Sequence, residues 1–201
     1  MKTRTKPSMN SPLKKAAHSQ VRIIGGTWRG QKLSFVPTEG LRPTGDRIRE
    51  TLFNWLASVI SGAHCLDLFA GSGALGFEAL SRGAQSTTLI EQNPSAITLL
   101  QQNQTHLKAE HANIIGANAI EWLKTTKPPQ PFDVVFLDPP FTADLLQPCC
   151  DLLQQEHLLA RNAHIYIEMD SQQPPPVTPT PWYPLKEKTT GQVTYRLFRI
   201  D

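Results

Sequence analysis

A glycine-rich segment of the chain has the residue types and spacing that suit a nucleoside-containing ligand. It runs Asp67-Leu-Phe-Ala-Gly-Ser-Gly-Ala-Leu-Gly76, and its glycines satisfy the pattern G-x-G-x-x-G. Glycines let the backbone turn sharply and approach a ligand, and a helix that begins there offers free N–H groups to a negative group. Glu91 lies 20 residues after Gly71, at the end of the next expected strand. A carboxylate there can accept hydrogen bonds from both ribose hydroxyls of an adenosine.

Asp67 distinguishes between two adenosine ligands, a dinucleotide and S-adenosylmethionine. An acid four residues before the first glycine would lie near a pyrophosphate and repel it, because both groups are negative. The same acid suits the ammonium of a methionine moiety. S-adenosylmethionine also brings a carboxylate, and no phosphate, to the loop amides. We therefore expect S-adenosylmethionine as the cofactor.

A second segment, Phe132-Asp-Val-Val-Phe-Leu-Asp-Pro-Pro-Phe141, places an acid and two prolines after an apolar strand. Asp138 is expected at the carboxyl end of that strand, on the same sheet edge as the glycine-rich segment, where open α/β sheets bind ligands. Pro139 and Pro140 restrict the backbone, so the Asp138 carboxylate and the Pro139 carbonyl become fixed acceptors. Phe141 adds an aromatic face. Fixed acceptors beside an aromatic face suit a nucleobase that carries an exocyclic amine.

The reaction predicted from the two segments is methylation of such an amine. The lone pair of the amine in guanine or adenine is delocalised into the ring, so the nitrogen is a poor nucleophile. Hydrogen bonds from its N–H groups to Asp138 and the Pro139 carbonyl would raise the electron density on nitrogen, and would strengthen as positive charge develops in the transition state. A sulfonium supplies an already activated methyl group, so in-line positioning contributes much of the rest.

From residue 64 onward the apolar pattern alternates between strands and helices, which predicts a doubly wound α/β sheet with right-handed crossovers. Apolar runs without polar alternation, such as Val134-Val-Phe-Leu137, are typical of strands covered by helices on both sides. We expect strands at residues 65–69, 87–91, 113–115, 133–137 and 164–168, and helices at residues 74–81, 95–107, 119–124 and 145–153.

Both ends of the chain depart from this alternation. Residues 21–35 contain two short β-prone runs around a glycine-rich turn, which predicts a hairpin. Residues 182–188 and 192–200 predict a terminal antiparallel hairpin on the sheet edge.

An amphipathic helix is expected between the first hairpin and the sheet, from about residue 46 to residue 58. Its apolar residues Ile48, Leu52, Trp55 and Val59 recur at spacings of four, three and four, which follow one helix face. Arg47 and Arg49 lie off that stripe, so we expect them to face solvent or a ligand.

The length of 201 residues suggests one domain with a small appendage. We expect a disordered basic tail at residues 1–19, an appendage of hairpin and helix at residues 20–60, and a catalytic domain at residues 61–201. Residues 1–49 hold 11 Lys or Arg and two acids, a net charge of +9, and the rest carries −6 because the whole chain is +3. A basic arm on a mildly acidic body suggests a polyanionic partner.

The composition also excludes several classes of protein. No apolar run is long enough for a membrane span, and the basic N-terminus lacks the apolar core of a secretory signal. The three cysteines and six histidines show no metal-like spacing, so we expect reduced thiols, no metal site and a cytoplasmic location.

These motifs resemble those of class I S-adenosylmethionine-dependent methyltransferases. Residues 67–76 resemble the first motif of that class, Glu91 the second, and Asp138–Phe141 the [D/N]-P-P-[F/Y/W] motif of amino methyltransferases. More narrowly, the chain is similar over residues 20–200 to the bacterial family that methylates guanine N2 in small-subunit ribosomal RNA (RsmD-type). The segments that carry this similarity are Arg22-Ile-Ile-Gly-Gly-Thr-Trp-Arg-Gly-Gln-Lys-Leu33, Leu41-Arg-Pro-Thr44, Asp46-Arg-Ile-Arg-Glu-Thr-Leu-Phe-Asn-Trp-Leu56, Leu66-Asp-Leu-Phe-Ala-Gly-Ser-Gly-Ala-Leu-Gly76 and Gly191-Gln-Val-Thr-Tyr-Arg-Leu197.

The resemblance implies a seven-stranded sheet and a set of site residues. The substrate it implies is a guanine in a head-region hairpin loop of 16S RNA, in an assembled or assembling small subunit. The residues implied for the cofactor are Asp67, Phe69, Ala70, Gly71, Ser72, Gly73, Glu91, Gln92, Asn118 and Ala119, those around the base are Asp138, Pro139, Pro140 and Phe141, and those for RNA are Arg22, Trp28, Arg29, Lys32, Arg42, Arg47 and Arg49. Asn118 stands where many class I enzymes have an acid facing the adenine amine, and packing of the hairpin is an alternative use for Trp28.

Two other functions remain open from the residues. An adenine-N6 methyltransferase acting on DNA or RNA would use the same acceptor motif, and the product nucleoside separates the two. A non-catalytic ribosome-assembly factor that keeps the fold is the other alternative, which the intact site residues disfavour. We expect a monomer, because no apolar helix face is left unexplained.

Overall fold

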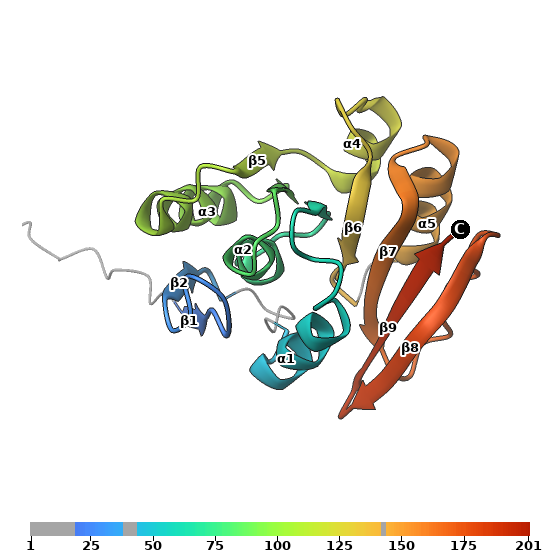
Figure 1. Ribbon diagram of the computed structural model, residues 1–201, viewed down its shortest axis with the longest axis horizontal. Coiled ribbons are helices and arrows are strands. Elements are labelled where there is room, and N and C mark those ends of the chain that lie inside the picture. Colours follow the sequence, from blue (N-terminus) through green and yellow to red (C-terminus); the bar gives the residue numbers. More distant parts are fainter. Residues whose placement is uncertain (1–18, 38–43, 142–143) are drawn as a thin grey trace, which may run out of the picture.

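The computed structural model describes residues 19–37, 44–141 and 144–201, and its centre is a seven-stranded sheet with helices on both faces (Figure 1). The strands lie in the order β5-β4-β3-β6-β7-β9-β8. β3 to β7 pair in parallel, while β9 is antiparallel to both of its neighbours. The bounds are β3 His64–Asp67, β4 Ser86–Glu91, β5 Ala112–Gly116, β6 Phe132–Leu137, β7 Leu159–Asp170, β8 Trp182–Thr190 and β9 Val193–Ile200. The predicted doubly wound sheet is confirmed.

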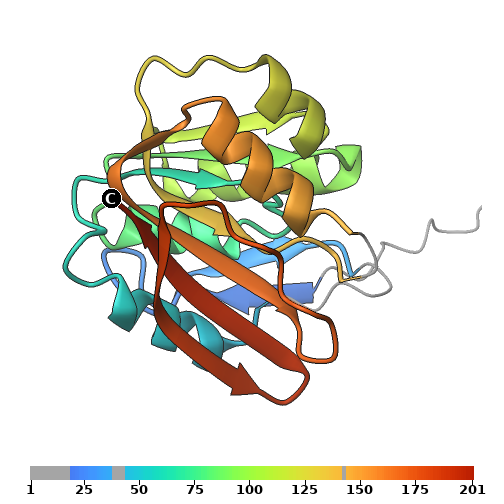
Figure 2. The ribbon, with the colours of Figure 1, turned by 90° about the vertical axis from the view of Figure 1, so that its right-hand side faces the viewer.

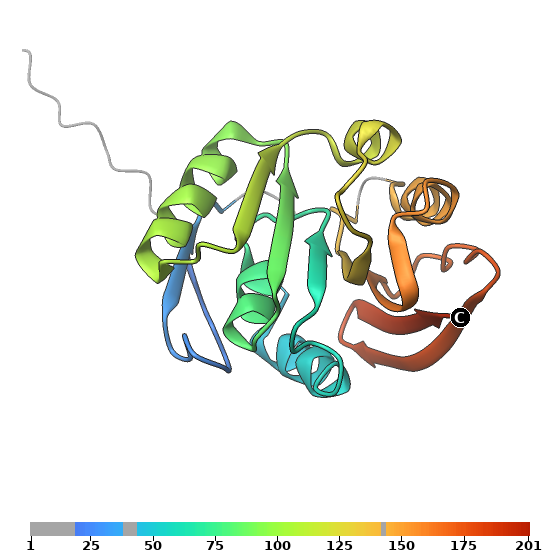
Figure 3. The same cartoon turned by 45° about the horizontal axis from the view of Figure 1, so that its top comes forward.

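The helices form a layer on each face of the sheet (Figure 3). Leu89 and Ile90, successive residues of β4, enter different core clusters, because neighbouring side chains of a strand point to opposite faces. The cluster around Ile90 includes buried residues of α4 and α5, and the clusters on the other face include those of α1, α2 and α3. The bounds are α1 Asp46–Trp55, α2 Ala74–Ser81, α3 Pro94–Leu107, α4 Ala119–Thr125 and α5 Leu146–Gln155.

The strand order reverses between β3 and β6. From β3 the chain continues through β4 to β5 at one edge, then returns to β6 on the other side of β3 and continues to β7. Loops that leave such neighbouring strands turn to opposite faces, and the crevice between them binds ligands. Asp67 ends β3, and Asp138 follows Leu137 at the end of β6, so the two motif segments meet at this crevice.

Two elements, β7 and α1, differ by more than two residues from the bounds predicted by the sequence pattern. β7 begins at Leu159 instead of residue 164. Its first part is polar and irregular, with a register shift opposite β6 and a positive φ of 63° at Asn162, so the sequence pattern does not reveal it as strand. α1 ends at Trp55, short of residue 58, and the turns after it bring Ile60 into the core.

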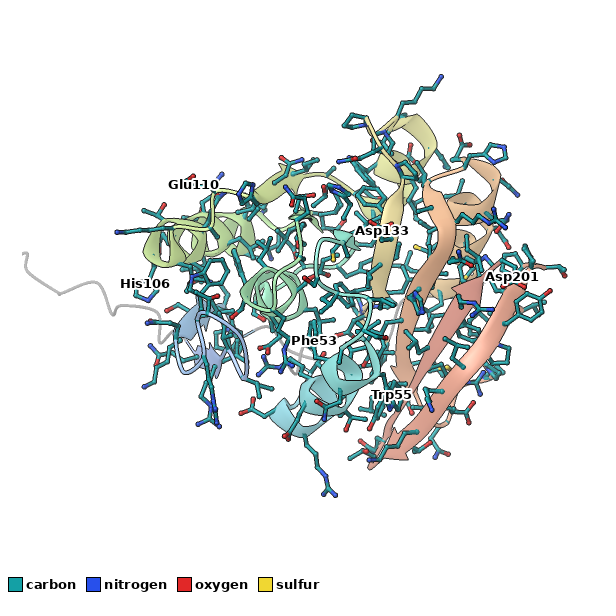
Figure 4. All side chains as sticks on the ribbon, in the orientation of Figure 1. Phe53, Trp55, His106, Glu110, Asp133 and Asp201 are labelled. Carbon is teal, nitrogen blue, oxygen red and sulfur yellow. The ribbon has the colours of Figure 1, made fainter. Side chains whose placement is uncertain are left out.

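The terminal hairpin is confirmed and forms one edge of the sheet (Figure 2). β9 lies between β7 and β8, and Gly191 has a φ of 61° in the turn that joins β8 to β9. Trp55 of α1 stacks on Tyr195 of β9 with ring centroids 5.3 Å apart, and Phe53 packs on Phe136 of β6 (Figure 4). α1 thus covers the junction between the parallel strands and the hairpin.

The N-terminal hairpin is confirmed as a separate antiparallel pair, β1 (Ser19–Arg22) and β2 (Lys32–Phe35). The predicted tail lies outside the described residues, apart from Ser19. The hairpin packs on α2 and α3 through Leu33 and its neighbours. Asn103 of α3 accepts a hydrogen bond from the Ser34 N–H at 3.0 Å and donates one to the Ser34 carbonyl at 2.9 Å. His106, labelled in Figure 4, adds a contact from α3 to the hairpin.

A buried carboxylate connects the hairpin to the sheet domain. Glu78 of α2 is fully buried and accepts hydrogen bonds from the N–H groups of Ile24 and Gly25, at 2.7 and 2.8 Å. Its Oε1 also accepts from Arg82 Nε at 2.7 Å, and Arg49 lies 3.7 Å from its other oxygen. We refer to these groups as the Glu78 cluster.

Arg49 is fully buried, so the expectation that it faces solvent or a ligand is wrong. Its guanidinium donates to the carbonyls of Thr44 and Arg22 and to the Asp46 carboxylate. Arg49 adjoins the apolar stripe of α1 on the side that faces α2, and a planar fork of donors can satisfy several acceptors there. Arg49 therefore holds the helix, the hairpin and Glu78 together and is not available to RNA.

Glu78→Gln is expected to lower the free energy of unfolding by about 3 kcal/mol, because it leaves buried arginine charge without its partner. Urea denaturation measures the change. The matched control is Glu187→Gln on β8, whose partner Arg196 is only partly buried and whose own side chain is 57% exposed. That change is expected to cost no more than about 1 kcal/mol. Equal losses in the two variants would contradict the role assigned to the Glu78 cluster.

Gly73→Ala is expected to cost about 3 kcal/mol of stability, which combines strain at positive φ with overpacking. Gly73 precedes α2 with a φ of 76°, and a Cβ there would lie 2.5 Å from the Phe77 ring and 2.8 Å from Leu100.

Gly62→Ala provides the matched control for this prediction. Gly62 has a φ of 77°, and nothing lies within 4 Å of its Cβ position. Only the backbone strain of roughly 1 kcal/mol remains in that variant. Thermal unfolding of both proteins gives the comparison, and a Gly73 variant no less stable than the control would refute the packing argument.

Candidate active site

Two adjoining pockets open at the crevice between the ends of β3 and β6. Their volumes are about 300 Å³ and about 770 Å³. We name them the Glu91 pocket and the Glu168 pocket after a carboxylate that lines each. Phe69, Gly71, Ser72, Asp138 and Pro140 line both pockets. The glycine-rich loop and the Asp138 loop together therefore form the wall between them.

The Glu91 pocket is bounded by loops that follow β3, β4 and β5. Glu91 Oε2 accepts a hydrogen bond from the Gly71 N–H at 2.9 Å, and its Oε1 accepts from the Asn93 N–H at 2.8 Å. The carboxylate therefore fixes the glycine-rich loop against the loop after its own strand. The remaining wall is largely apolar, with polar groups at a few positions, and includes Phe35, Val36, Leu68, Ile90, Gln92, Ala96, Ala117, Asn118, Ala119 and Ile120.

Asn118 lies at this pocket as the N-cap of α4. Its Oδ1 accepts from the N–H groups of Ile120 and Glu121, at 3.0 and 3.2 Å, and its Nδ2 donates to Gln92 Oε1 at 3.2 Å. Capping is a sufficient reason for an asparagine here, since an amide oxygen satisfies the free donors of a helix start. The Asn118 oxygen thus already accepts two hydrogen bonds, at the position where many class I enzymes have an acid facing the adenine amine.

The Glu168 pocket concentrates negative charge. Asp67, Asp138 and Glu168, at or beside the ends of the neighbouring strands β3, β6 and β7, line it together. Among the described residues, no Lys, Arg or His side chain forms an ion pair with any of the three. The rest of its wall includes Thr44, Gly45, Ile48, Ala70, Ala74, Leu75, Pro139, Phe141, Asp170, Gln192 and Val193.

Asp67 is buried under the glycine-rich loop. Its Oδ2 accepts a hydrogen bond from the Gly76 N–H at 3.1 Å, which ties the end of β3 to the first turn of α2. Burial, and then the charge of Asp138, raise the pKa of Asp67 to about 7. A cation in the pocket would favour its ionised form.

Asp138 lies at the meeting point of the two pockets. Its Oδ2 accepts a hydrogen bond from the Thr44 hydroxyl at 2.7 Å, which fixes the carboxylate. Burial raises the pKa of Asp138 to about 6, against the lowering effect of that hydrogen bond. The group remains mostly ionised, and thus an acceptor, at neutral pH.

Glu168 and Thr44 also line the Glu168 pocket, although no role was predicted for either residue from the sequence. Tyr166 donates its hydroxyl to Glu168 Oε2 at 2.7 Å, and burial, followed by the Asp138 charge, raises the pKa of Glu168 to about 8. Glu168 could have been identified from the sequence, because it is an acid near the end of an apolar strand, like Glu91. Thr44 lies in the segment Leu41-Arg-Pro-Thr44, whose chemistry alone does not reveal a contact with a residue 94 positions away.

The structure brings together most of the residues predicted for the cofactor and the base. Gly73 is the exception, because it lines neither pocket and instead shapes the turn into α2. The RNA set lies outside the pockets: Arg22, Arg29, Lys32 and Arg47 are exposed, and Arg42 lies outside the described residues. Trp28 is partly buried against the core cluster beneath the hairpin, and its backbone N–H donates to Ser81 Oγ.

Two further classes of site were sought in residues 19–37, 44–141 and 144–201. They contain no group of three or more His, Cys, Asp or Glu side chains placed to hold a metal ion. None of their helices has both the length and the apolar character needed to cross a membrane.

Comparison with known proteins identifies the family. The sequence family described as "conserved hypothetical protein 95" matches residues 21–199. The ribosomal RNA small subunit methyltransferase D of Haemophilus influenzae is 49% identical over 185 residues, which cover 91% of this chain and 95% of that protein. Among solved structures, the putative methyltransferase yhhF from Escherichia coli has a TM-score of 0.81 at 49% identity, over 91% of this chain and 99% of that one.

A more distant structure shares only the fold. An RNA methyltransferase from Salinibacter ruber, solved in complex with S-adenosyl-L-homocysteine, has a TM-score of 0.61 at 17% identity, over 79% of this chain and 94% of that one. The class I methyltransferase architecture, the match over residues 21–199 and the 49% identity to a curated relative agree with one another. The chain therefore belongs to the conserved hypothetical protein 95 family, the RsmD family.

Proposed function

We propose that the protein transfers a methyl group from S-adenosylmethionine to the exocyclic N2 amine of a guanine in 16S ribosomal RNA. The observation that carries this proposal is Asp138, a fixed and partly buried acceptor in the wall shared by two pockets. The name of the Haemophilus influenzae relative supports small-subunit ribosomal RNA as the substrate class. We further propose that the protein acts as a monomer on the small subunit, or on its assembly intermediate, in the cytoplasm.

The residues of the two pockets fit S-adenosylmethionine by charge and by shape. Asp67, Asp138 and Glu168 bring buried negative charge to the Glu168 pocket, and a ligand with ammonium and sulfonium groups would offset it. Glu91 and the apolar wall of the other pocket suit an adenosine. When S-adenosylmethionine is bound across the two pockets, its sulfonium would supply the activated methyl group. Asp67 would hold the ammonium, while Gly71 and Ser72 would bring the loop amides close to the carboxylate.

The Glu168 pocket, the larger of the two, also suits the target base. Asp138 would accept a hydrogen bond from the amine, and the Pro139 carbonyl would accept a second one, while Phe141 offers a face for stacking. The N–C bond would form as the S–C bond breaks, and the Asp138 carboxylate would take the extra proton from the amine nitrogen. Acceptors that are already fixed in place stabilise the positive charge that develops on nitrogen without reorganisation.

The exposed basic residues would guide the RNA to this pocket. Arg22, Arg29 and Lys32 belong to the hairpin, and Arg47 lies on α1 next to Ile48, which lines the Glu168 pocket. Phosphate contacts of this kind contribute affinity that falls with salt concentration and carry no base specificity. Arg49 is excluded from this set by its burial.

The direct test is methyl transfer from labelled S-adenosylmethionine to small subunits that lack the modification, with naked 16S RNA and duplex DNA in parallel. Mass spectrometry of the nucleosides identifies the product. N2-methylguanosine from the ribosomal samples is expected. N6-methyladenine would transfer the same site to the adenine alternative, and no product together with no cofactor binding would favour a non-catalytic assembly factor.

Asp138→Asn is expected to lower kcat by about 10²- to 10³-fold, because a fixed anionic acceptor is lost at the reacting nitrogen. Cofactor affinity by calorimetry is expected to stay within a few fold. Burial raises the pKa of Asp138 from its ordinary value of 3.8 to about 6, so ionisation of this group destabilises the fold as pH rises through that interval. At pH 7 the variant is therefore at least as stable as the wild type.

The control for this prediction is Asp151→Asn, on α5 away from both pockets. It is expected to turn over at the wild-type rate. An Asp138→Asn protein with near-normal turnover would contradict the assigned role of Asp138.

Arg47→Ala is expected to weaken RNA binding without affecting cofactor binding. If Arg47 contacts one phosphate, the slope of log affinity against log salt falls by about 0.7 to 0.9 in magnitude. Filter binding to 16S RNA over a range of salt concentrations measures that slope. Lys186→Ala on the exposed strand β8 serves as the control and should leave the slope unchanged. Identical slopes in the wild type and the Arg47 variant would rule out a phosphate contact by Arg47.

A further inference from the structure

Glu168 lies beside Asp138, and the chemistry described so far gives it no contact with the target base. The register pairs Leu137 of β6 with Ile167 of β7 in parallel, so Asp138 and Glu168 are the residues that directly follow the last pair. Neighbouring strands lie about 4.8 Å apart. Both side chains line the Glu168 pocket, and Glu168 is only 3% exposed. A buried acid next to the reacting position needs a partner or a function.

Separate hydroxyl groups hold the two carboxylates in place. Tyr166 donates to Glu168 Oε2 at 2.7 Å from the same face of β7. The Thr44 hydroxyl donates to Asp138 at 2.7 Å, and its proximity to Glu168 lowers the pKa of that carboxyl. Both carboxylates line the pocket that would hold the base.

We propose that Glu168 accepts the N1–H of the target guanine while Asp138 accepts its N2–H, so that Glu168 determines specificity for guanine. This inference rests on the proposed guanine-N2 activity and identifies how that site would recognise its base. Guanine presents N1–H and N2–H as adjacent donors on one edge. Adenine presents an amine beside N1, which is an acceptor, and would face the Glu168 carboxylate with a lone pair.

The same contact would also assist the chemistry. A carboxylate that accepts the N1–H raises electron density in the amidine unit that includes N2, so the amine becomes a better nucleophile. Recognition requires the ionised form of Glu168, because the protonated acid would donate instead of accept. The pKa of Glu168, raised to about 8 by burial, would fall beside a cationic cofactor, which favours the ionised form. The titratable groups around it are Tyr166 on its own strand, Tyr195 opposite it on β9, Asp138 directly after β6 and Asp67 at the end of β3.

The decisive substrate is a base that keeps the amine and reverses the N1 position. 2,6-Diaminopurine has an exocyclic amine at C2, but its N1 is an acceptor. Once mass spectrometry has located the methylated guanosine, a synthetic fragment carrying 2,6-diaminopurine riboside at that position is ligated into 16S RNA. The RNA is assembled into small subunits, and kcat/KM is measured for both substrates with the full chain.

The wild type is expected to prefer guanosine over diaminopurine by roughly 30-fold, the effect of one charged hydrogen bond lost in a buried site. In Glu168→Gln the amide can donate to N1 of diaminopurine, so the preference is expected to fall to about one. A merely structural role would lower both rates together and leave their ratio unchanged. Glu187→Gln on β8 is the matched control and should retain the wild-type ratio.

Three results would overturn the inference. The first is a Glu168→Gln variant that keeps the wild-type preference for guanosine over diaminopurine. The second is a wild type that uses both bases equally well. Tyr166→Phe removes the hydroxyl that holds Glu168, so a second variant is available if the first does not fold, and its ratio should fall several-fold. The third result is a Tyr166→Phe variant that keeps the wild-type preference for guanosine. A wild type that yields N6-methyladenosine would instead overturn the proposed function, and the product distinguishes that failure from the other three.

Discussion

The reversal of strand order between β3 and β6 is the constraint on which the site depends. Because the chain runs outward from β3 and returns beside it, two loops that follow buried parallel strands end next to each other. One loop needs glycines, since Gly73 adopts a positive φ with the Phe77 ring against it. The other needs rigidity, which Pro139 and Pro140 provide. Neither loop alone forms a pocket, and their shared wall forms two.

The same constraint concentrates charge at the sheet edge. Asp67, Asp138 and Glu168 lie at or near the ends of adjacent strands, and burial is the largest cause of the raised pKa of each. Holding such groups in their ionised form lowers the stability of the fold. The clusters of apolar side chains on both faces of the sheet can offset that loss. A cationic ligand would offset it locally, which links the electrostatics of the sheet edge to the cofactor chemistry proposed for it.

The sequence predicted the architecture well because buried parallel strands and their helices leave strong local patterns. It also identified most of the pocket walls, since motif residues at strand ends share one edge. Residues outside such motifs were harder to place. Arg49 was expected to be exposed because helical periodicity locates the apolar stripe but not the partner beside it, here Glu78 of α2. Thr44 was missed because its contact with Asp138 is set by tertiary packing.

The burial of Arg49 changes how the N-terminal segment should be understood. Arg49 bonds to backbone carbonyls near both the hairpin and α1, while Glu78 holds the N–H groups of Ile24 and Gly25. The hairpin is therefore fixed to α2 and α1 by the buried, charged side chains of Glu78 and Arg49. Its exposed cations consequently keep a constant position relative to the pocket that Ile48 lines. Phosphate contacts made by such a surface would set the register of the RNA, and with it which base can reach Asp138.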